Sequence, residues 1–278
     1  MSKLLSPGLS LAAAASWGAA DFSGGIASKS ANVFGVVVVA HATGLVFLTL
    51  LALVSGERVP GAVPLLWGAL AGVIGAIGLA ALYRALAIGK MGIVAPLSAV
   101  ITAIVPLLFG FLTEGLPGAL PIAGFAVALV SIWLIAAGPG AAETQGVGLA
   151  IVAGVGFGGF LLFIKLAGAT AVFWPLVSAR SASFLLMLAI ALASGKPWNP
   201  ARGRVGVMIL AGILDAGANA LFVLAAHSGR LDVAAVLSSL YPASTVILAR
   251  VVLKEHLSRP QRVGMAAALL AVALIAAR

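Results

Sequence analysis

Long apolar runs without a single charged residue dominate the pattern of hydrophobic and polar positions along the chain. Asp, Glu, Lys and Arg are absent from residues 30–56, 59–83, 91–113, 115–142 and 144–164. Each run reaches the roughly 20 residues that a helix needs to cross the hydrocarbon of a bilayer. The pattern therefore predicts an all-α integral membrane protein.

Ten transmembrane helices fit these runs and the polar segments that separate them. Connections rich in glycine and proline, such as SGERVPGAVP and SGKPWNPARGR, mark several boundaries. The first span follows Lys3 but is longer than the apolar part of a signal peptide and contains Trp17 and Asp21, so we interpret it as a retained helix. The predicted spans are residues 7–28, 33–55, 64–88, 92–113, 119–138, 146–168, 174–194, 205–226, 232–253 and 260–277.

The composition supports a membrane protein and excludes several other classes. Hydrophobic residues make up 63% of the 278 residues and charged residues only 8%, against roughly 25% charged residues in a typical soluble domain. The net charge is +9, but the basic residues occur singly between apolar runs, which is typical of loops that orient helices and not of nucleic-acid binding. The absence of cysteine excludes disulfides, thiolate metal sites and cysteine nucleophiles.

The two halves of the chain resemble each other when one is shifted by about half the chain length. A constant offset of this kind is typical of an internal duplication, and it predicts repeats over residues 1–140 and 141–278. With an offset of 140 residues, Trp17-Gly18 aligns with Phe157-Gly158 and ALAIGK (85–90) with AAHSGR (225–230).

Each predicted repeat contains five spans, and an odd number inserts the second repeat upside down relative to the first. Secondary transporters commonly use such inverted repeats, with the substrate site near the middle of the membrane between the halves. The predicted fold is therefore ten transmembrane helices arranged as two inverted five-helix repeats. Glycines at small-xxx-small spacing, Gly68 with Gly72 and Gly154 with Gly158, predict close packing between helices.

Two segments carry a resemblance to a known family. The opening LAAAASWGAADFSGGIASK and the stretch VLSSLYPASTVILARVVLKEHLS (236–258) resemble the two ends of an EamA-type domain of the drug/metabolite transporter superfamily. That repeat begins with an apolar run into Trp-Gly and ends with a proline-bearing helix followed by Gly/Lys-Glu-x-Leu. Both copies are covered, and within the family the chain is most similar to bacterial amino-acid and metabolite exporters of the YddG type.

The resemblance implies a secondary transporter rather than an enzyme. It implies export of amino acids, aromatic ones among them, or of similar small metabolites, by alternating access and without a cofactor. We accordingly expect a multi-pass protein of a bacterial inner membrane that functions as a monomer. The first copy departs from the pattern, because Pro96 and Pro106 flank the position that matches Pro242.

Ionisable residues inside predicted spans are candidates for function, because an unpaired charge is costly in lipid. Asp21 and His41 lie at about the same depth, measured from the loop that joins their spans. A carboxylate beside an imidazole can accept and release protons near neutral pH. The alternative is a hydrogen bond that only holds the first two spans together.

Arg180 and Asp215 form the second candidate pair. Their depths differ by about five residues, or roughly 7.5 Å along a helix, which the long Arg side chain can span. They either form an ion pair or bind opposite ends of a zwitterionic solute. Asn219 shares a helix face with Asp215 and offers both a hydrogen-bond donor and an acceptor.

The span 232–253 combines a proline with hydroxyl groups. Pro242 removes a backbone hydrogen bond, which predicts a kink, and we treat Pro96, Pro106 and Pro242 as candidate hinges. The hydroxyl side chains near it either face a substrate cavity or bond to the carbonyls four residues earlier in their own helix. The predicted substrate-binding residues are Trp17, Tyr83, Arg180, Asp215, Asn219, Ser238, Tyr241 and Ser244.

Two other classes of membrane protein and the orientation of the chain stay open. A polytopic enzyme usually clusters His, Asp or Cys, whereas His41, His227 and His256 are dispersed and predict no metal site. A channel would show a solute-independent conductance. The distribution of basic residues between loops favours termini outside the cell, whereas the family resemblance implies termini inside.

Overall fold

Helices form all of the regular secondary structure in the part of the chain that the structure describes. This computed structural model describes residues 5–114, 118–136, 145–167, 171–195, 203–228, 237–238 and 240–276. The prediction of an all-α chain with ten main helices is confirmed over these residues. The helices are α1 (Leu5–Ser28), α2 (Val33–Val54), α3 (Ala62–Ile88), α4 (Met91–Glu114), α5 (Ala119–Ala136), α6 (Val147–Ala167), α7 (Phe173–Ala193), α8 (Val205–Ser228), α10 (Tyr241–Val252) and α11 (Arg259–Ala276).

Five of the described helices are long and apolar enough to cross a membrane. They are α2, α3, α6, α7 and the Val205–Phe222 part of α8. Large apolar side chains near the end of α2 face outward: Leu53 is 62% exposed and Val54 is 85% exposed. Large apolar side chains on an outer face are stable next to lipid and unfavourable in water.

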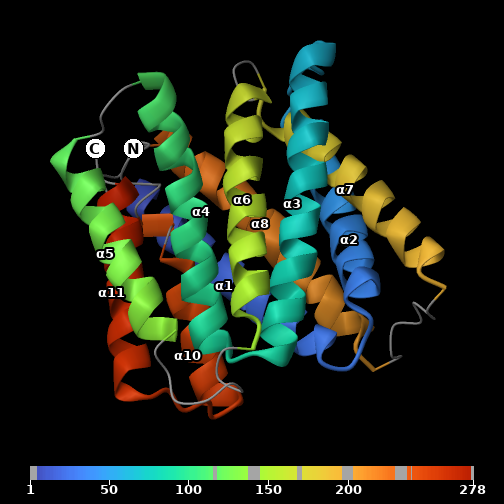
Figure 1. Ribbon diagram of the computed structural model, residues 1–278. Helices are drawn as coiled ribbons and strands as arrows, with labels where there is room; N and C mark the ends of the chain where they lie inside the picture. Colours follow the sequence, from blue (N-terminus) through green and yellow to red (C-terminus); the bar gives the residue numbers. More distant parts are fainter. Residues whose placement is uncertain are drawn as a thin grey trace.

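The helices stand side by side in one bundle, with both ends of the chain on the same side. In Figure 1, α1 begins and α11 ends at the same, upper end of the bundle, and the α1–α2, α3–α4 and α10–α11 connections lie at the lower end. The α5–α11 pair forms one side of the bundle and the α2–α7 pair the other.

Most of the extensive helix contacts join the first five helices to the last five. Helix α3 packs on α6 and α7, while α8 packs on α1 and α2. Helix α4 packs on α6, and α10 packs on α1. These contacts correspond between the two halves of the chain. The contact of α3 with α6 corresponds to that of α8 with α1, α3 with α7 to α8 with α2, and α4 with α6 to α10 with α1.

Glycines allow the closest of these approaches. A side chain at Gly72 would collide with the backbone of Ala179 on α7, and one at Gly158 with Val105 on α4. Gly156 of α6 lies directly against the backbone of Gly78 on α3. The predicted close packing at the small-residue positions is confirmed, because both glycine pairs face a neighbouring helix.

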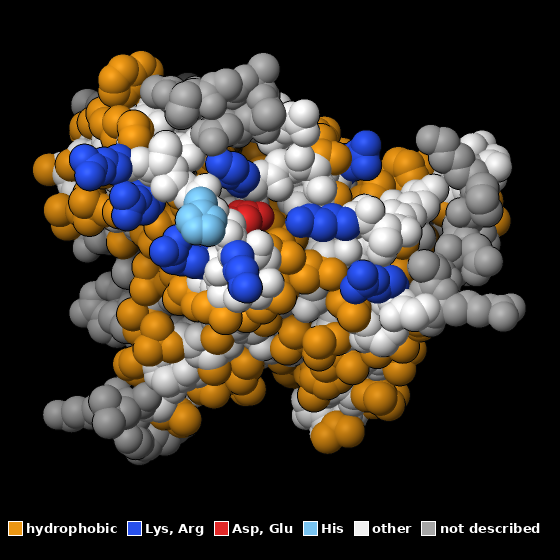
Figure 2. Space-filling view, turned by 90° about the horizontal axis from the view of Figure 1, so that it is seen from below, with side chains coloured by type: hydrophobic (Ala, Val, Ile, Leu, Met, Phe, Trp, Pro, Cys, Tyr) orange, Lys and Arg blue, Asp and Glu red, His pale blue; other side chains and the backbone are white. Residues whose placement is uncertain are grey.

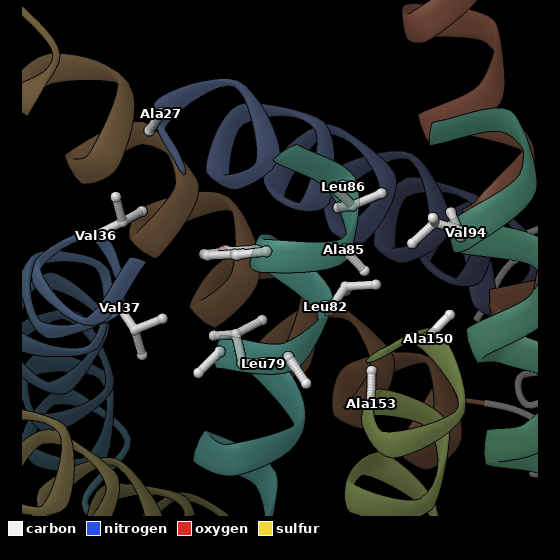
Figure 3. Close-up of a cluster of buried hydrophobic side chains, with 14 of the residues drawn as sticks. Ala27, Val36, Val37, Leu79, Leu82, Ala85, Leu86, Val94, Ala150 and Ala153 are labelled. Atoms are coloured by element: carbon white, nitrogen blue, oxygen red, sulfur yellow. The ribbon is translucent and has the colours of Figure 1, made fainter. Parts of the chain in front are cut away.

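The main hydrophobic core is centred on the second half of α3. Leu82 and Leu86 are fully buried there, in one cluster with valines of α2 and α4 and alanines of α6 (Figure 3). This core holds α3 between the helices that carry most of the polar residues described below.

One predicted span differs from the structure at its start. The prediction placed a helix over 232–253 with a kink at Pro242, whereas α10 begins at Tyr241 and has Pro242 in its first turn. Residues 231–236 and 239 lie outside the described residues. The first turn of a helix suits proline, because its missing N–H would have no partner there in any case.

Candidate functional site

An ion pair lies inside the bundle. The guanidinium group of Arg180 on α7 binds the carboxylate of Asp215 on α8. The Arg180 side chain is 14% exposed and the Asp215 side chain 19%, so the pair is not sealed from its surroundings. Of the two predicted arrangements the structure contains the ion pair, and binding of a solute by these residues stays a prediction.

A close approach between α2 and α8 brings a histidine beside this pair. A side chain at Gly212 of α8 would collide with the backbone of Ala40 on α2. A Cβ at Gly44 of α2 would lie 3.9 Å from Nε of Arg180. His41 lies one turn before Gly44, and the charge of Arg180 is close enough to act on its ring.

His41 has no hydrogen-bond partner among the described residues. Its side chain is 3% exposed, and neither ring nitrogen bonds to any residue that the structure describes. The alternative of a hydrogen bond that locks the first two helices together is therefore not observed. Leaving a buried polar group unsatisfied costs roughly 1–3 kcal/mol, and such groups call for an explanation in function.

Asp21 is a second buried ionisable residue and lies on α1, which packs on α8. Its side chain is 9% exposed, and no hydrogen bond to it is seen within the described ranges. Asp21, His41, Arg180 and Asp215 thus come from four helices, α1, α2, α7 and α8, that pack on one another.

Asn219 uses part of its hydrogen-bonding capacity within its own helix. Its Nδ2 donates to the backbone carbonyl of Asp215 at 2.7 Å. This bond places the amide directly beside the ion pair, one turn further along α8. A carboxamide still has a second N–H and an oxygen that can contact a solute.

Three aromatic side chains form a group next to the charged residues. The ring of Trp17 on α1 lies 5.9 Å from that of Phe222 on α8. It also meets the ring of Tyr241 on α10 edge to face, with a centroid distance of 6.2 Å. All three side chains are only partly buried, and Trp17 lies one turn from Asp21 on the same face of α1.

The structure adds Phe222 to the residues found by sequence. Phe222 lies three residues after Asn219 and seven after Asp215, so all three share one face of α8. The spacing of Phe222 from Asp215 and Asn219 was the signal that the sequence offered. It could not single out Phe222, because apolar residues occur on every face of a membrane helix.

Tyr83 differs from the other aromatic candidates. Its side chain is fully buried, and its ring lies flat against Gly24 of α1, where any larger residue would collide with it. The charges of Asp215, Asp21 and Arg180 all act on its hydroxyl group. Tyr83 is therefore buried between α3 and α1, and its role in substrate binding stays a prediction.

The hydroxyl groups of the α10 region bond to α1. Ser238 Oγ donates to the carbonyl of Ser10 at 3.3 Å, and Thr245 Oγ1 donates to that of Gly18 at 3.1 Å. Ser244 packs directly on Gly18. Ser238 therefore bonds to α1 and not to a carbonyl of its own helix, and substrate binding by Ser238 and Ser244 stays a prediction.

The candidate hinge prolines lie in two helices. Pro96 is buried in α4, which continues as a helix through Pro96 and Pro106; the side chain of Pro106 lies outside the described residues. Pro242 is buried in the first turn of α10. A mid-helix kink at Pro242 is therefore wrong for the described helix, and the hinge role of all three prolines stays a prediction.

Two glutamates that sequence reasoning did not assign to any contact join the halves of the chain. At the lower end of the bundle, the Glu255 carboxylate accepts hydrogen bonds from the backbone N–H groups of Met91 and Gly92, each at 3.1 Å. Beside it, Lys90 Nζ donates to the carbonyl of His256 at 3.2 Å. The Glu255 charge thereby caps the start of α4.

The second glutamate makes the same kind of contact at the opposite end. The Glu57 carboxylate accepts hydrogen bonds from the N–H groups of Val172, Phe173 and Trp174 at 3.0–3.2 Å. The indole N–H of Trp174 donates to the backbone carbonyl of Glu57 at 2.9 Å. Glu57 therefore caps the start of α7, and nothing in the local sequence of either glutamate indicates its partner.

The described residues contain no group of three His, Asp or Glu side chains that could hold a metal ion. The side chain of His227 lies outside the described residues, and His256 is exposed at the lower end of the bundle.

Comparisons with known proteins agree with this arrangement. Residues 144–277, slightly less than half of the chain, match the model of the EamA-like transporter family. No curated protein matches the chain significantly. A solved structure described only as the crystal structure of a protein covers 98% of this chain and 96% of its own, with a TM-score of 0.65 and 16% sequence identity. This similarity shows a shared fold over nearly the whole chain.

The apolar helices and the family match together indicate a multi-pass membrane protein. Its C-terminal half is similar to the EamA-like transporter family over residues 144–277, which agrees with the resemblance over the second predicted repeat.

Proposed function

We propose that the chain is a secondary transporter of the drug/metabolite superfamily that exports amino acids, aromatic ones among them, from a bacterial cell. The observation that carries this proposal is the ion pair of Arg180 and Asp215 beside an aromatic group, inside a bundle of membrane helices. The EamA-like match over 144–277 supports transport as the class of function.

The proposed binding mode exchanges one ion pair for two. The substrate carboxylate binds Arg180, and its ammonium group binds Asp215 with help from the Asn219 amide. The substrate side chain then contacts the ring group of Trp17, Phe222 and Tyr241. Neither protein charge is left unpaired at any stage, which matters because an unpaired charge is expensive in the membrane interior.

Asp21 and His41 are the proposed proton-coupling residues. Each lies within electrostatic range of one member of the ion pair, so opening of that pair by a substrate changes the charge that each residue experiences. Binding of substrate and of protons is thereby linked through Arg180 and Asp215, and such a linkage is reciprocal.

Alternating access between two inverted repeats, 1–140 and 141–278, is the proposed mechanism. It is supported by the exchange of helix contacts, in which α3 on α6 is matched by α8 on α1. The capping contacts of Glu57 and Glu255, which tie the halves at opposite ends of the bundle, also support it. We propose that a single copy of the chain performs this cycle in the inner membrane.

Counterflow in proteoliposomes tests the proposal. Vesicles loaded with unlabelled phenylalanine should accumulate labelled phenylalanine, and excess tryptophan or tyrosine should compete. Stimulation only by other metabolites or drugs would replace amino acids as the substrate class. A solute-independent ion conductance would indicate a channel, and chemical conversion of a lipid or quinone would indicate a membrane enzyme.

A further inference from the structure

Basic side chains gather on one face of the molecule. Figure 2 views the lower end of the bundle and shows Lys and Arg side chains around a small acidic area and a histidine. This end lies opposite the end at which α1 begins and α11 ends (Figure 1). Eight basic residues of the described chain flank helix ends on this basic face: Lys29, Arg84, Lys90, Arg204, Arg250, Lys254, Arg259 and Arg262.

Among the described residues, the opposite end of the bundle is much poorer in positive charge. The basic residues that flank helix ends there, within the described ranges, are Arg58 and Lys165. Each end also has one capping glutamate, Glu255 on the basic face and Glu57 opposite. The capping glutamates therefore do not cancel the asymmetry in charge between the described residues of the two ends.

The basic face contains a cavity with a mixed lining. It has a volume of about 190 Å³ and lies where α4 begins, α10 ends and α11 begins. Arg250 and Arg262 provide its positive charge, and Val246, Leu257 and Met265 its apolar wall. Glu255 also lines it, but this carboxylate already accepts two backbone hydrogen bonds.

We propose that this cavity binds an anionic phospholipid and that the basic face is the cytoplasmic face of the protein. The lipid phosphate lies between the guanidinium groups of Arg250 and Arg262, and the start of an acyl chain lies on Val246 and Met265. Guanidinium groups suit phosphate because they donate hydrogen bonds in a planar fork. An anionic phospholipid carries a negatively charged phosphate next to an apolar acyl chain. The arginines of the cavity therefore suit the phosphate, and the apolar wall suits the start of the chain.

The orientation follows from the same charges. Short loops rich in Lys and Arg remain on the cytoplasmic side during insertion, and the surface of that leaflet is negative and attracts basic segments. The basic face therefore lies in the cytoplasm, and the end at which α1 begins and α11 ends lies outside. This orientation is opposite to the one that the family resemblance implied.

Single cysteines test the orientation, because the natural chain contains none. Ser30→Cys lies in the exposed α1–α2 connection of the basic face, and Gly61→Cys lies in the exposed α2–α3 connection at the opposite end. No atom crowds a side chain at Gly61. A membrane-impermeant maleimide should label Gly61→Cys in intact cells, and Ser30→Cys only after the cells are opened. The reverse pattern, or labelling of both in intact cells, overturns the proposed orientation.

Melting temperatures in nanodiscs test the lipid site. Replacing a third of the neutral phosphatidylcholine by phosphatidylglycerol should raise the melting temperature of the natural protein by several degrees. Arg250→Gln/Arg262→Gln should lose at least half of this increase, whereas Arg58→Gln at the opposite end should keep it. An equal increase in all three proteins overturns the site.

A second variant and a second probe keep the lipid test decisive. If the double variant does not fold, Arg262→Gln alone is used, since this side chain is exposed on the first turn of α11. Inorganic phosphate in neutral nanodiscs should have no effect. An increase with phosphate that depends on Arg250 and Arg262 would overturn lipid as the ligand and assign the cavity to a free anion. None of these measurements depends on transport, so they remain valid whether or not the proposed function holds.

Discussion

At the scale of single residues, substitutions of the Arg180–Asp215 ion pair separate its structural role from its proposed role in substrate binding. Removing one partner of a buried ion pair leaves an uncompensated charge, whereas replacing both partners by neutral groups is often tolerated. The two roles that such a pair can have, structural and substrate-binding, therefore make different predictions for single and double substitutions.

Asp215→Asn should lower both the free energy of unfolding and the affinity for phenylalanine. The loss of stability should be on the order of 1–3 kcal/mol, because Arg180 is left without its charged partner. Arg180→Gln/Asp215→Asn should regain most of that stability and still fail to transport. Melting temperature and counterflow measured on the same purified proteins check this. Normal transport by a well-folded double variant would remove both residues from the site.

His41→Leu should leave the protein at least as stable as the natural chain. The His41 ring has no hydrogen-bond partner among the described residues, so a side chain of similar volume removes no bond and avoids an unsatisfied buried group. Transport should lose much of its dependence on pH, because the imidazole proposed to take up and release protons is removed. His256→Leu, at an exposed position, is the matched control. An unchanged pH profile in His41→Leu would exclude this histidine from proton coupling.

Contacts between the polar residues could be predicted from sequence only where depth along the helices decides which residues meet. Counting residues from the helix ends was sufficient to bring Arg180 and Asp215 together. It was not sufficient for Asp21 and His41, which were predicted at similar depth but form no hydrogen bond with each other among the described residues. Rotation of each helix about its own axis decides such contacts. That rotation depends on glycines such as Gly44 and Gly212, whose role appears only when two helices meet.

At the scale of elements, carboxylate caps from distant loops fix where helices begin. An ordinary N-cap precedes its helix in sequence, as Asn32 does for α2, where Oδ1 accepts the N–H of Phe34 at 3.0 Å. The caps of α4 and α7 come instead from Glu255 and Glu57, far away in the chain. Hydropathy predicted the apolar interiors of these helices well, but it contains no information about caps that only the folded chain brings together.

Glu255→Ala should lower the free energy of unfolding by about 1 kcal/mol, the usual effect of losing a helix cap. It should also loosen the contact between α4 and the end of α10, since the only described side chain that binds the Met91 and Gly92 N–H groups is removed. Glu255→Gln keeps an acceptor oxygen and should lose less. Thermal melting and hydrogen exchange of the Met91 and Gly92 amides measure the two effects. Unchanged exchange in Glu255→Ala would show that the cap does not hold this end closed.

At the scale of the whole molecule, the two ends of the bundle are held by contacts of the same kind between the two halves of the chain. A transporter that alternates access must break such contacts at one end while the other end stays closed. The contacts of Glu255 and Lys90 close the basic face in this structure. A rigid scaffold would have no need to open them.

Cross-linking across the basic face should therefore stop transport. Lys90 Nζ contacts the backbone carbonyl of His256, so Lys90→Cys/His256→Cys places two thiols within reach of a short bifunctional methanethiosulfonate, and no natural cysteine competes for it. Treatment should abolish counterflow in the double variant, and reduction should restore it. Each single variant treated in the same way should transport normally, which controls for modification alone. Full counterflow by a protein that is cross-linked to completion would contradict alternating access through this face, because the basic end would then never need to open.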